Sequence, residues 1–266
     1  INLVCSSDPE QINALISTIG YLMHSFKTSA NNKAVILNDE TISENPNGGS
    51  GKGIFWNALS RVKRVSDING KSFSFEKSFP YQTVSADTQI LVFDDVQKNF
   101  KFENLFSVIT EGITLEKKNK DAIKIPVSRS PKIVITTNYT LGGVGGSFER
   151  RKWELEFSSY FSSTHTPLNE FGRMLFDEWD NAEWQRFYNY MISCLQMYLT
   201  NGLVEHGFKN LYIRKLIKET NHEFYEWIED SDSLTYNQRL NKTVVFTQFI
   251  EEYPDFKRWL TQRKFW

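Results

Sequence analysis

The residues whose types and spacing could do chemistry begin in a short glycine-rich stretch, NPNGGSGKG, at positions 45–53. The small residues Asn47-Gly48-Gly49-Ser50-Gly51 allow successive backbone N–H groups to turn toward an anion, and Lys52 adds a positive charge for nucleotide phosphates. The stretch departs from the phosphate-binding pattern G-x-x-x-x-G-K-[ST] at Pro46 and at Gly53, which lacks the hydroxyl that normally helps to hold Mg²⁺. Taken alone, it could be a nucleotide site over residues 47–53 or a flexible glycine–serine turn.

Two adjacent carboxylates, Asp94 and Asp95, end the apolar run TQILVFDDV about forty residues after Lys52. Paired carboxylates at a strand end are costly without a cation. Here they could hold Mg²⁺, directly or partly through water, and polarise an attacking water molecule. The alternative is that both acids simply leave a sheet for a solvated loop. Because Lys52 precedes them, we favour the first interpretation, which predicts ATP and Mg²⁺ as ligands.

Further polar residues follow the next apolar run, PKIVITTN. Asn138 closes that run, where an amide could hydrogen-bond the γ phosphate or the attacking water. Beyond it, the segment SFERRKWELEF contains Arg150 and Arg151. An arginine at a subunit edge can reach the ATP of a neighbouring subunit and stabilise the charge of the transition state. The alternative for this pair is an ordinary basic cluster on the surface.

The elements that must position these residues can be predicted from hydrophobic patterning. Residues 33–38, 88–96 and 131–138 form unbroken apolar runs, which are typical of strands covered on both faces of a parallel α/β sheet. The segment 53–63 returns to helical spacing directly after the glycine-rich stretch. Residues 113–127 alternate as two strands around a basic tip that contains Lys118 and Lys120.

Four segments follow from these patterns. Residues 1–32 contain an amphipathic helix that begins at Asp8-Pro9 and is expected to pack on the core, which spans 33–165. Residues 166–202 form a helical extension, and 203–266 form a small helical or winged-helix-like subdomain. Within the extension, the segment EWQRFYNYMISCLQMYL places seven apolar or aromatic side chains on one side: Trp184, Phe187, Tyr188, Met191, Ile192, Leu195 and Leu199. We interpret this stripe as core-facing, with base stacking as the alternative.

Composition limits the remaining choices. Lysine and arginine number 31 against 32 aspartate and glutamate, a net charge of −1, so any nucleic-acid surface must be a local patch. The two cysteines stand far apart and form no zinc-binding or disulfide pattern. No apolar run approaches the roughly 20 residues needed to cross a bilayer, so we expect no membrane partner. A reducing cytoplasm is the simplest compartment.

In order and compactness, these motifs resemble those of the superfamily 3 helicases, the hexameric AAA+ DNA helicases of small DNA viruses, phages and mobile elements. The resemblance covers roughly residues 33–160, with NPNGGSGKG, ILVFDDV, ITLEKKNKDAIKIPV and SPKIVITTN standing in the family's order. It implies a P-loop ATPase core with a parallel central sheet, a β-hairpin insertion and flanking helices. The helices beyond Pro167 are also similar to those of phage and plasmid primase-helicases, in which a primase-polymerase region precedes the ATPase on the same chain.

The resemblance also implies roles for single residues. Lys52 would bind phosphate, Asp94 and Asp95 would serve the metal and the attacking water, and Asn138 would be the sensor. Arg150 would be the arginine finger, with Arg151 as its close rival. Lys118 and Lys120, the cations of the hairpin tip, would grip the backbone of single-stranded DNA in the channel of a homohexamer.

The predicted activity is therefore ATP hydrolysis that drives a replicative DNA helicase in a bacterial host, with 3′ to 5′ movement implied by the family alone. A rival from another class is an ATP-binding module that assembles a replication-initiation complex with little or no motor activity. A third interpretation, a kinase acting on a small molecule, leaves the basic hairpin, Asn138 and Arg150 without a role.

Overall fold

The computed structural model describes residues 1–40, 48–139, 141, 145–207, 212–213, 216–217, 220–230 and 239–265. The chain forms two compact units, Ile1–Lys209 and Asn210–Trp266. The predicted segments 1–32, 33–165 and 166–202 fall within the first unit, and the predicted segment 203–266 begins seven residues before the second. Among the described helices, none is both long enough and apolar enough to cross a membrane.

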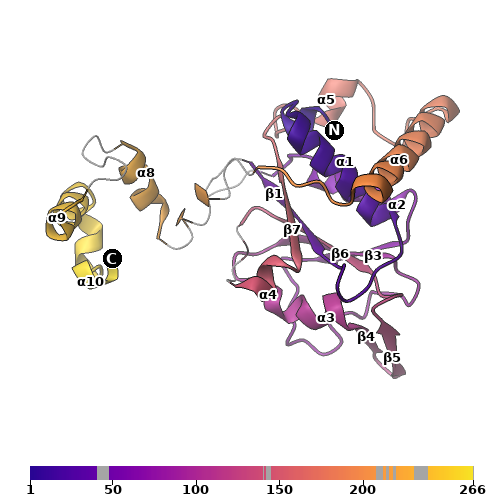
Figure 1. The fold of residues 1–266 in the computed structure, drawn as a ribbon, viewed down its shortest axis with the longest axis horizontal. Helices are drawn as coiled ribbons and strands as arrows, with labels where there is room; N and C mark the ends of the chain where they lie inside the picture. The colour runs from indigo at the N-terminus through magenta and orange to yellow at the C-terminus, as the bar shows by residue number, and fades with distance from the viewer. Residues whose placement is uncertain are drawn as a thin grey trace. The chain divides into compact units, whose positions relative to one another are not determined.

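A five-stranded parallel sheet forms the centre of the first unit (Figure 1). The order of its strands is β2-β3-β6-β1-β7, and each neighbouring pair is parallel. After β1 the chain crosses to the far edge, returns strand by strand through β6, and finally adds β7 on the other side of β1. In open α/β sheets, ligands bind beyond the carboxyl ends of the strands at such a reversal. The strands are β1 (Ala34–Asp39), β2 (Val65–Asn69), β3 (Ile90–Val96), β6 (Lys132–Thr137) and β7 (Lys152–Phe157).

Helices cover both faces of this sheet (Figure 1). Successive side chains of a strand point to opposite faces, so Val35 and Leu37 of β1 pack with α1, α2 and α6, whereas Ile36 packs with the η2–α3 segment and α4. Burial on both faces explains the unbroken apolar runs in the sequence. The helices of this unit are η1 (Leu3–Cys5), α1 (Pro9–Met23), α2 (Lys52–Ser60), η2 (Phe102–Leu105), α3 (Phe106–Thr110), α4 (Gly146–Glu149), α5 (Pro167–Phe171) and α6 (Asn181–Asn201).

A separate two-stranded hairpin projects from this core (Figure 1). Strand β4 (Gly112–Lys117) pairs with the antiparallel strand β5 (Lys120–Pro126). Asn119 turns the chain at the tip with φ of +58°, a left-handed conformation that asparagine tolerates better than most residues. The predicted fold class, an α/β core with a parallel central sheet, a β-hairpin insertion and flanking helices, is therefore confirmed.

The predicted stripe of α6 faces the core only in part. Met191 of the stripe is 3% exposed, and Trp184, Phe187 and Leu195 are half-buried. Tyr188, Ile192 and Leu199 are 43%, 51% and 60% exposed, whereas Cys194, outside the predicted stripe, is fully buried. The reason is the crossing with α1, where a Cβ on Gly20 would lie only 2.1 Å from the carbonyl oxygen of Cys194. This close approach fixes the buried face of α6 on the side of Met191 and Cys194, so the part of the predicted stripe that carries Tyr188, Ile192 and Leu199 lies toward solvent.

The second unit has its own small aromatic core. Phe249 is fully buried, and the rings of Phe224, Trp227 and Phe265 lie within 5.2 to 6.4 Å of it or of one another, centre to centre. Among the residues described in this unit, the regular elements are helical. They are α8 (His222–Asp230), α9 (Lys242–Glu252), η3 (Pro254–Arg258) and α10 (Gln262–Phe265).

Candidate nucleotide site

The glycine-rich loop connects β1 to α2 and lies beyond the carboxyl end of β1. Gly48, Gly49 and Gly51 have φ values of +63°, +89° and +101°, which residues other than glycine rarely adopt. Such a run of left-handed glycines turns backbone N–H groups inward as an anion-binding nest, and the N-terminus of α2 adds its positive end. This backbone suits a phosphate. Asn47, also predicted to bind the nucleotide, lies outside the described residues.

Lys52, the first residue of α2, stands at the centre of a polar cluster. Its Nζ lies 2.5 Å from Asp39 Oδ1, and it donates hydrogen bonds to Asn138 Oδ1 at 2.7 Å and to Ser50 Oγ at 3.3 Å. Ser50 in turn donates to Asp39. The structure thus brings together two predicted residues, Lys52 and Asn138, that are 86 positions apart in the sequence.

Asp39 is the member of this cluster that sequence reasoning missed. Its side chain is 13% exposed and that of Lys52 is 11% exposed, so the ion pair is sheltered from water. The sequence did contain a signal for Asp39, because this acid directly follows the apolar run KAVILN and is the last residue of β1. Polar residues at the ends of β3 and β6 were considered as site residues, but the acid at the end of β1 was not.

Asp94 and Asp95 lie near this cluster in the fold, at the carboxyl end of β3, but point to different partners. Thr136 Oγ1 of the adjacent strand β6 donates to Asp94 Oδ1 at 2.8 Å and accepts from the backbone N–H of Asp95 at 2.7 Å. At a break in the β3–β6 register, Asp95 has φ of +58°. Its carboxylate pairs with Lys71 at 2.6 Å.

The Asp95–Lys71 pair is exposed, with side chains 40% and 66% accessible to solvent. The hydrogen bond and the charge of Asp95 raise the pKa of Lys71 above its usual value. Exposed pairs contribute little stability and exchange readily with other partners. Asp94 and Asp95 supply oxygen atoms of the kind that Mg²⁺ prefers, although among the described residues no group of three or more His, Cys, Asp or Glu side chains could form a metal centre by itself. The donor set therefore fits a Mg²⁺ ion that keeps much of its water shell.

The structure has room for a hydroxyl-bearing side chain at position 53. A Cβ at this position would meet nothing within 4 Å, and Gly53 has an ordinary helical place in the first turn of α2. A serine would therefore fit. Among the described residues, the hydroxyl that bonds to the Lys52 ammonium is that of Ser50, which is 5% exposed and also donates to Asp39.

The structure separates Arg150 from Arg151. Arg150 caps the end of α4, and its side chain is exposed. Arg151 is partly buried, where its guanidinium lies 4.7 Å from the ring centre of Phe106 and Nη1 donates to the carbonyl oxygen of Ser147 at 2.8 Å. Arg151 is thus occupied by contacts within its own unit, whereas Arg150 extends into solvent.

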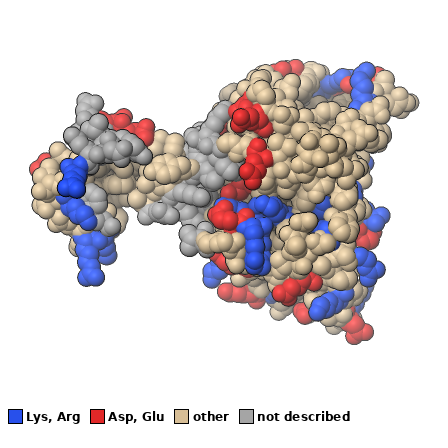
Figure 2. Space-filling model, in the orientation of Figure 1, with Lys and Arg blue, Asp and Glu red and all other residues tan. Residues whose placement is uncertain are grey.

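The hairpin places the two predicted DNA-binding lysines at its tip. Lys118 lies in the turn and Lys120 begins β5, and both side chains are exposed. On the face of the first unit drawn in Figure 2, basic and acidic side chains lie beside one another. The hairpin tip thus exposes two positive side chains, Lys118 and Lys120, to solvent.

The fold and the site share three features with P-loop proteins: a parallel sheet, a glycine-rich turn after β1, and a lysine at the start of the next helix. Comparisons with known proteins add limited information. A family of unknown function, DUF5906, matches residues 44–151, which is less than half of the chain. No match was found among curated proteins.

Three solved structures show low similarity to this chain. The A-form apo structure of the NrS-1 C-terminal region is 14% identical with a TM-score of 0.49, over 94% of this chain and 60% of that one. A structure of the same region described as residues 305–718 gives 14%, 0.49, 97% and 60%. A JCV helicase with a bound acetamide compound is 14% identical with a TM-score of 0.37, over 80% of this chain and 66% of that one. This chain thus spans less than two thirds of the NrS-1 chains.

Proposed function

We propose that this chain is the ATPase core of a superfamily 3 DNA helicase, which hydrolyses ATP and moves along single-stranded DNA as a homohexameric ring. One observation carries the proposal: the Lys52 ammonium donates to the Asn138 side chain at 2.7 Å. This contact unites the glycine-rich loop after β1 with the polar end of β6. A surface turn that only happened to be rich in glycine would have no reason to be so placed.

In the proposed site, the backbone of Gly48, Gly49, Gly51 and Gly53 surrounds the phosphates, with Ser50 beside them. Lys52 neutralises the β and γ phosphates, and the Asn138 amide orients the γ phosphate or the attacking water. Asn47 belongs to the same proposed loop. Mg²⁺, when bound, would neutralise charge on the phosphate oxygens. Asp94 would hold its water shell, and Asp95, once released from Lys71, would orient or polarise the attacking water.

The proposed hexameric ring would use exposed cations that have no role within a single subunit. Arg150 is exposed at the end of α4 and lacks the contacts with the Phe106 side chain and the Ser147 carbonyl oxygen that hold Arg151. We therefore assign Arg150, rather than Arg151, as the residue that enters the ATP site of a neighbouring subunit. Six hairpin tips bearing Lys118 and Lys120 would concentrate positive charge in the channel, and lysine contacts to the DNA backbone are independent of sequence.

The wider setting is part of the same proposal. A primase-polymerase region would stand on the same full-length chain, and the protein would act in the cytoplasm of a bacterial host cell. The chemistry of the ATP site depends on neither.

A second function is favoured by a specific feature of the site. Lys52 is paired with Asp39, Asp95 is paired with Lys71, and position 53 has no hydroxyl. These features suit a module that binds ATP to assemble an initiation complex and turns it over slowly or not at all. The two functions make opposite predictions about the response of turnover to DNA.

Steady-state ATPase activity with Mg²⁺, measured with and without single-stranded DNA at ring-forming concentrations, separates them. The motor predicts turnover that DNA stimulates, that Lys52→Ala abolishes, and whose stimulation falls in Lys118→Gln. Lys98→Gln is the matched control, because Lys98 is exposed in a loop after β3. ATP binding by confirmed rings without turnover would reject the motor and support the assembly module.

A further inference from the structure

A cavity lies at the amino ends of the sheet strands, opposite the carboxyl ends where the proposed ATP site is found. It has a volume of about 270 Å³ and is lined at the amino ends of strands, by Arg64 before β2, Gln89 before β3 and Lys132 at the start of β6. The strands run for about six residues at roughly 3.3 Å each, which separates the two sites by about 20 Å. The cavity is thus distinct from the Lys52 cluster and independent of it.

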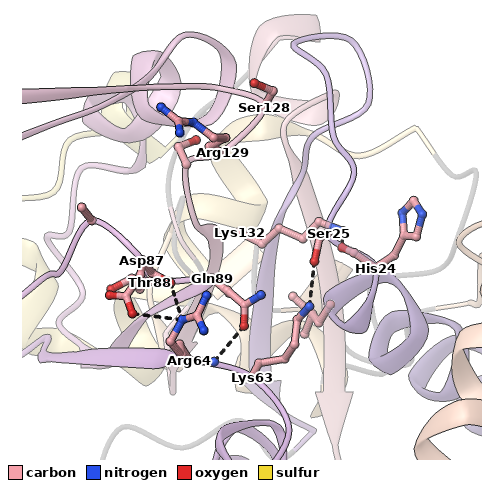
Figure 3. Close-up of a pocket in the computed structure, with 13 residues that line it drawn as sticks. His24, Ser25, Lys63, Arg64, Asp87, Thr88, Gln89, Ser128, Arg129 and Lys132 are labelled. Atoms are coloured by element: carbon pink, nitrogen blue, oxygen red, sulfur yellow. Dashed lines mark hydrogen bonds and ion pairs between the residues drawn. The ribbon is translucent and has the colours of Figure 1, made fainter.

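The lining is strongly basic. Lys63, Arg64, Arg129 and Lys132 face the cavity, against a single acid, Asp87. Figure 3 shows Arg129 and Ser128 on one side, Arg64, Gln89 and Lys63 on the opposite side, and Lys132 between them. Asp87 forms an ion pair with Arg64, in which Arg64 Nε lies 3.1 Å from the Asp87 carboxylate. Three positive groups therefore remain around the cavity without a compensating acid among the residues that the structure describes.

Two of the nearby cations are deeply buried. Lys132 is 3% exposed and donates to the carbonyl oxygens of Tyr21 and His24 at the end of α1. Lys27, which does not line the cavity, is 2% exposed and donates to Ser130 Oγ at 2.9 Å and to the Pro131 carbonyl oxygen at 2.7 Å. These carbonyl groups satisfy hydrogen bonds but carry no net charge.

The electrostatic cost of this arrangement is visible in the lysines themselves. Burial lowers the pKa of Lys27 and of Lys132 to about 7, and the charges of Lys27 and Lys63 add to the effect on Lys132. Burial also lowers the pKa of Lys63. Buried charges are normally paired, and no carboxylate pairs with these three lysines within the described part of the chain. An anion in the cavity would offset this cost.

The surrounding groups narrow the chemistry of that anion. Hydroxyl groups of Ser25, Ser128 and Thr88 line the cavity together with the cations, and the guanidinium of Arg129 makes no hydrogen bond or ion pair with any described residue. Arginine forks, ammonium groups and hydroxyls are the donors that recognise phosphate oxygens. The volume is below the range of about 300–1,000 Å³ typical of pockets for drug-sized ligands, which favours a small, highly charged group.

We propose that this cavity is a second anion site that binds a phosphate group, held by Arg129, Lys63 and Lys132. The group is either a backbone phosphodiester of a nucleic acid or a free phosphate, because both present the same oxygens. Arg129 belongs to the segment that leads from the end of β5 to β6. A bound phosphate would therefore contact the base of the hairpin as well as the edge of the sheet.

The test uses two probes and two pairs of matched variants. Arg129→Gln and Lys63→Gln each remove one cation of the cavity. Arg186→Gln and Lys98→Gln remove an exposed cation elsewhere, on α6 and in the loop after β3. Inorganic phosphate is titrated into proteins that also carry Lys52→Ala, so that the glycine-rich loop contributes little, and binding is followed by the amide NMR shifts of residues 128–130. A fluorescein-labelled single-stranded oligothymidine is titrated into proteins with Lys52 intact, and binding is followed by anisotropy at several salt concentrations.

We expect saturable phosphate shifts that weaken about tenfold in Arg129→Gln and Lys63→Gln but not in the controls, as for the loss of one charge-assisted hydrogen bond. If the natural ligand is a nucleic acid, oligonucleotide affinity also falls in these variants and its salt slope decreases by about one. Unchanged oligonucleotide binding identifies free phosphate as the source. Because Arg129 is exposed in a loop, Arg129→Gln carries the test even if Lys63→Gln fails to fold.

The proposal is overturned if neither probe distinguishes the cavity variants from the controls. Oligonucleotide binding that weakens in Lys118→Gln alone, with no phosphate response at residues 128–130, also overturns it, because that result reports on the hairpin tip. Neither outcome depends on ATP hydrolysis, so failure of the second site and failure of the proposed ATPase can be told apart.

Discussion

Replacing Asp39 with asparagine is expected to tighten the binding of ATP in the absence of Mg²⁺. Asp39 Oδ1 lies 2.5 Å from Lys52 Nζ, and both side chains are nearly buried, so water screens the pair only weakly. In the proposed site, a triphosphate must draw Lys52 away from Asp39 while also meeting the negative charge of that carboxylate. Asparagine preserves the shape of the side chain and removes its charge.

The size of the effect follows from the strength of this contact. A hydrogen bond to a charged group contributes about 1.5–3 kcal/mol, and about 1.4 kcal/mol corresponds to a factor of ten in affinity. The amide oxygen of asparagine can still accept a hydrogen bond from Lys52, so only part of this energy is released. We therefore expect the Kd for ATP in EDTA to fall about tenfold in Asp39→Asn.

The assay is a calorimetric titration of a non-hydrolysable ATP analogue into the wild type, Asp39→Asn, Lys52→Ala and the double variant. Asp67→Asn, which neutralises an exposed acid on β2, is the matched control for net charge. If Asp39 acts by holding Lys52, the gain in affinity disappears when Lys52 is already absent, and the double-variant cycle measures this coupling.

Two results would refute this reasoning. Weaker binding of Asp39→Asn in EDTA would mean that the carboxylate supports the nucleotide rather than competing with it. A gain of equal size in the Lys52→Ala background would mean that Asp39 acts by general repulsion, without the ion pair. Repeating the titration with Mg²⁺ shows whether Asp39 also serves the metal, because in that case the gain is lost or reversed.

Two further predictions concern stability. Gly20→Ala should lower the free energy of unfolding by about 1–3 kcal/mol in urea, because the added methyl group would lie 2.1 Å from the carbonyl oxygen of Cys194, whereas Gly146→Ala meets nothing within 4 Å and should be nearly neutral. Burial lowers the pKa of Lys27 and of Lys132 from 10.5 to about 7 in the folded protein. Between pH 7 and 9.5 the unfolded chain therefore binds more protons than the folded one. The free energy of unfolding should rise with pH in this range by at most about 1.4 kcal/mol per pH unit for each lysine. Below pH 7 both states are protonated and this contribution levels off; a urea midpoint that stays flat from pH 7 to 9.5, or a slope that Lys132→Met leaves unchanged, would contradict the assignment.

Sequence patterns predicted the parts of the fold whose burial is complete. The apolar runs that form β1, β3 and β6 are buried on both faces of the sheet, and an unbroken apolar run is typical of a parallel strand covered on both faces. The hairpin was equally clear because its strands alternate and are separated by a polar turn. By contrast, β2, with the sequence VSDIN, is an edge strand with half-buried and exposed residues. Its place is set by pairing with β3, which no local pattern reveals.

The sequence suggested candidate residues for the site but not the contacts among them. Lys52 follows the glycine-rich stretch, and Asp94 and Asn138 stand at the ends of apolar runs, so a role could be proposed for each one separately. The position of Asp39 after an apolar run could be seen in the sequence, but its partners depend on the strand order. Because β1 lies directly beside β6, Asp39 at the end of β1 and Asn138 after β6 both reach Lys52. The same limitation explains α6, where the buried face depends on a close approach to Gly20 of α1 and not on the distribution of apolar residues in the helix alone.

The charges in the proposed ATP site are already paired with one another, and this pairing suggests how the site can tolerate Gly53. Lys52 forms a nearly buried ion pair with Asp39, whereas Asp95 forms a solvent-exposed ion pair with Lys71. A triphosphate alone can replace the partner of Lys52 but leaves Asp39 without a cation, and Mg²⁺ alone can attract the carboxylates but leaves Lys52 in its ion pair. The complex of Mg²⁺ with ATP supplies an anion for the lysine and a cation for the carboxylates at once. In this proposal, selectivity for the complex comes from the exchange of ion pairs, and the hydroxyl that position 53 lacks has less to contribute.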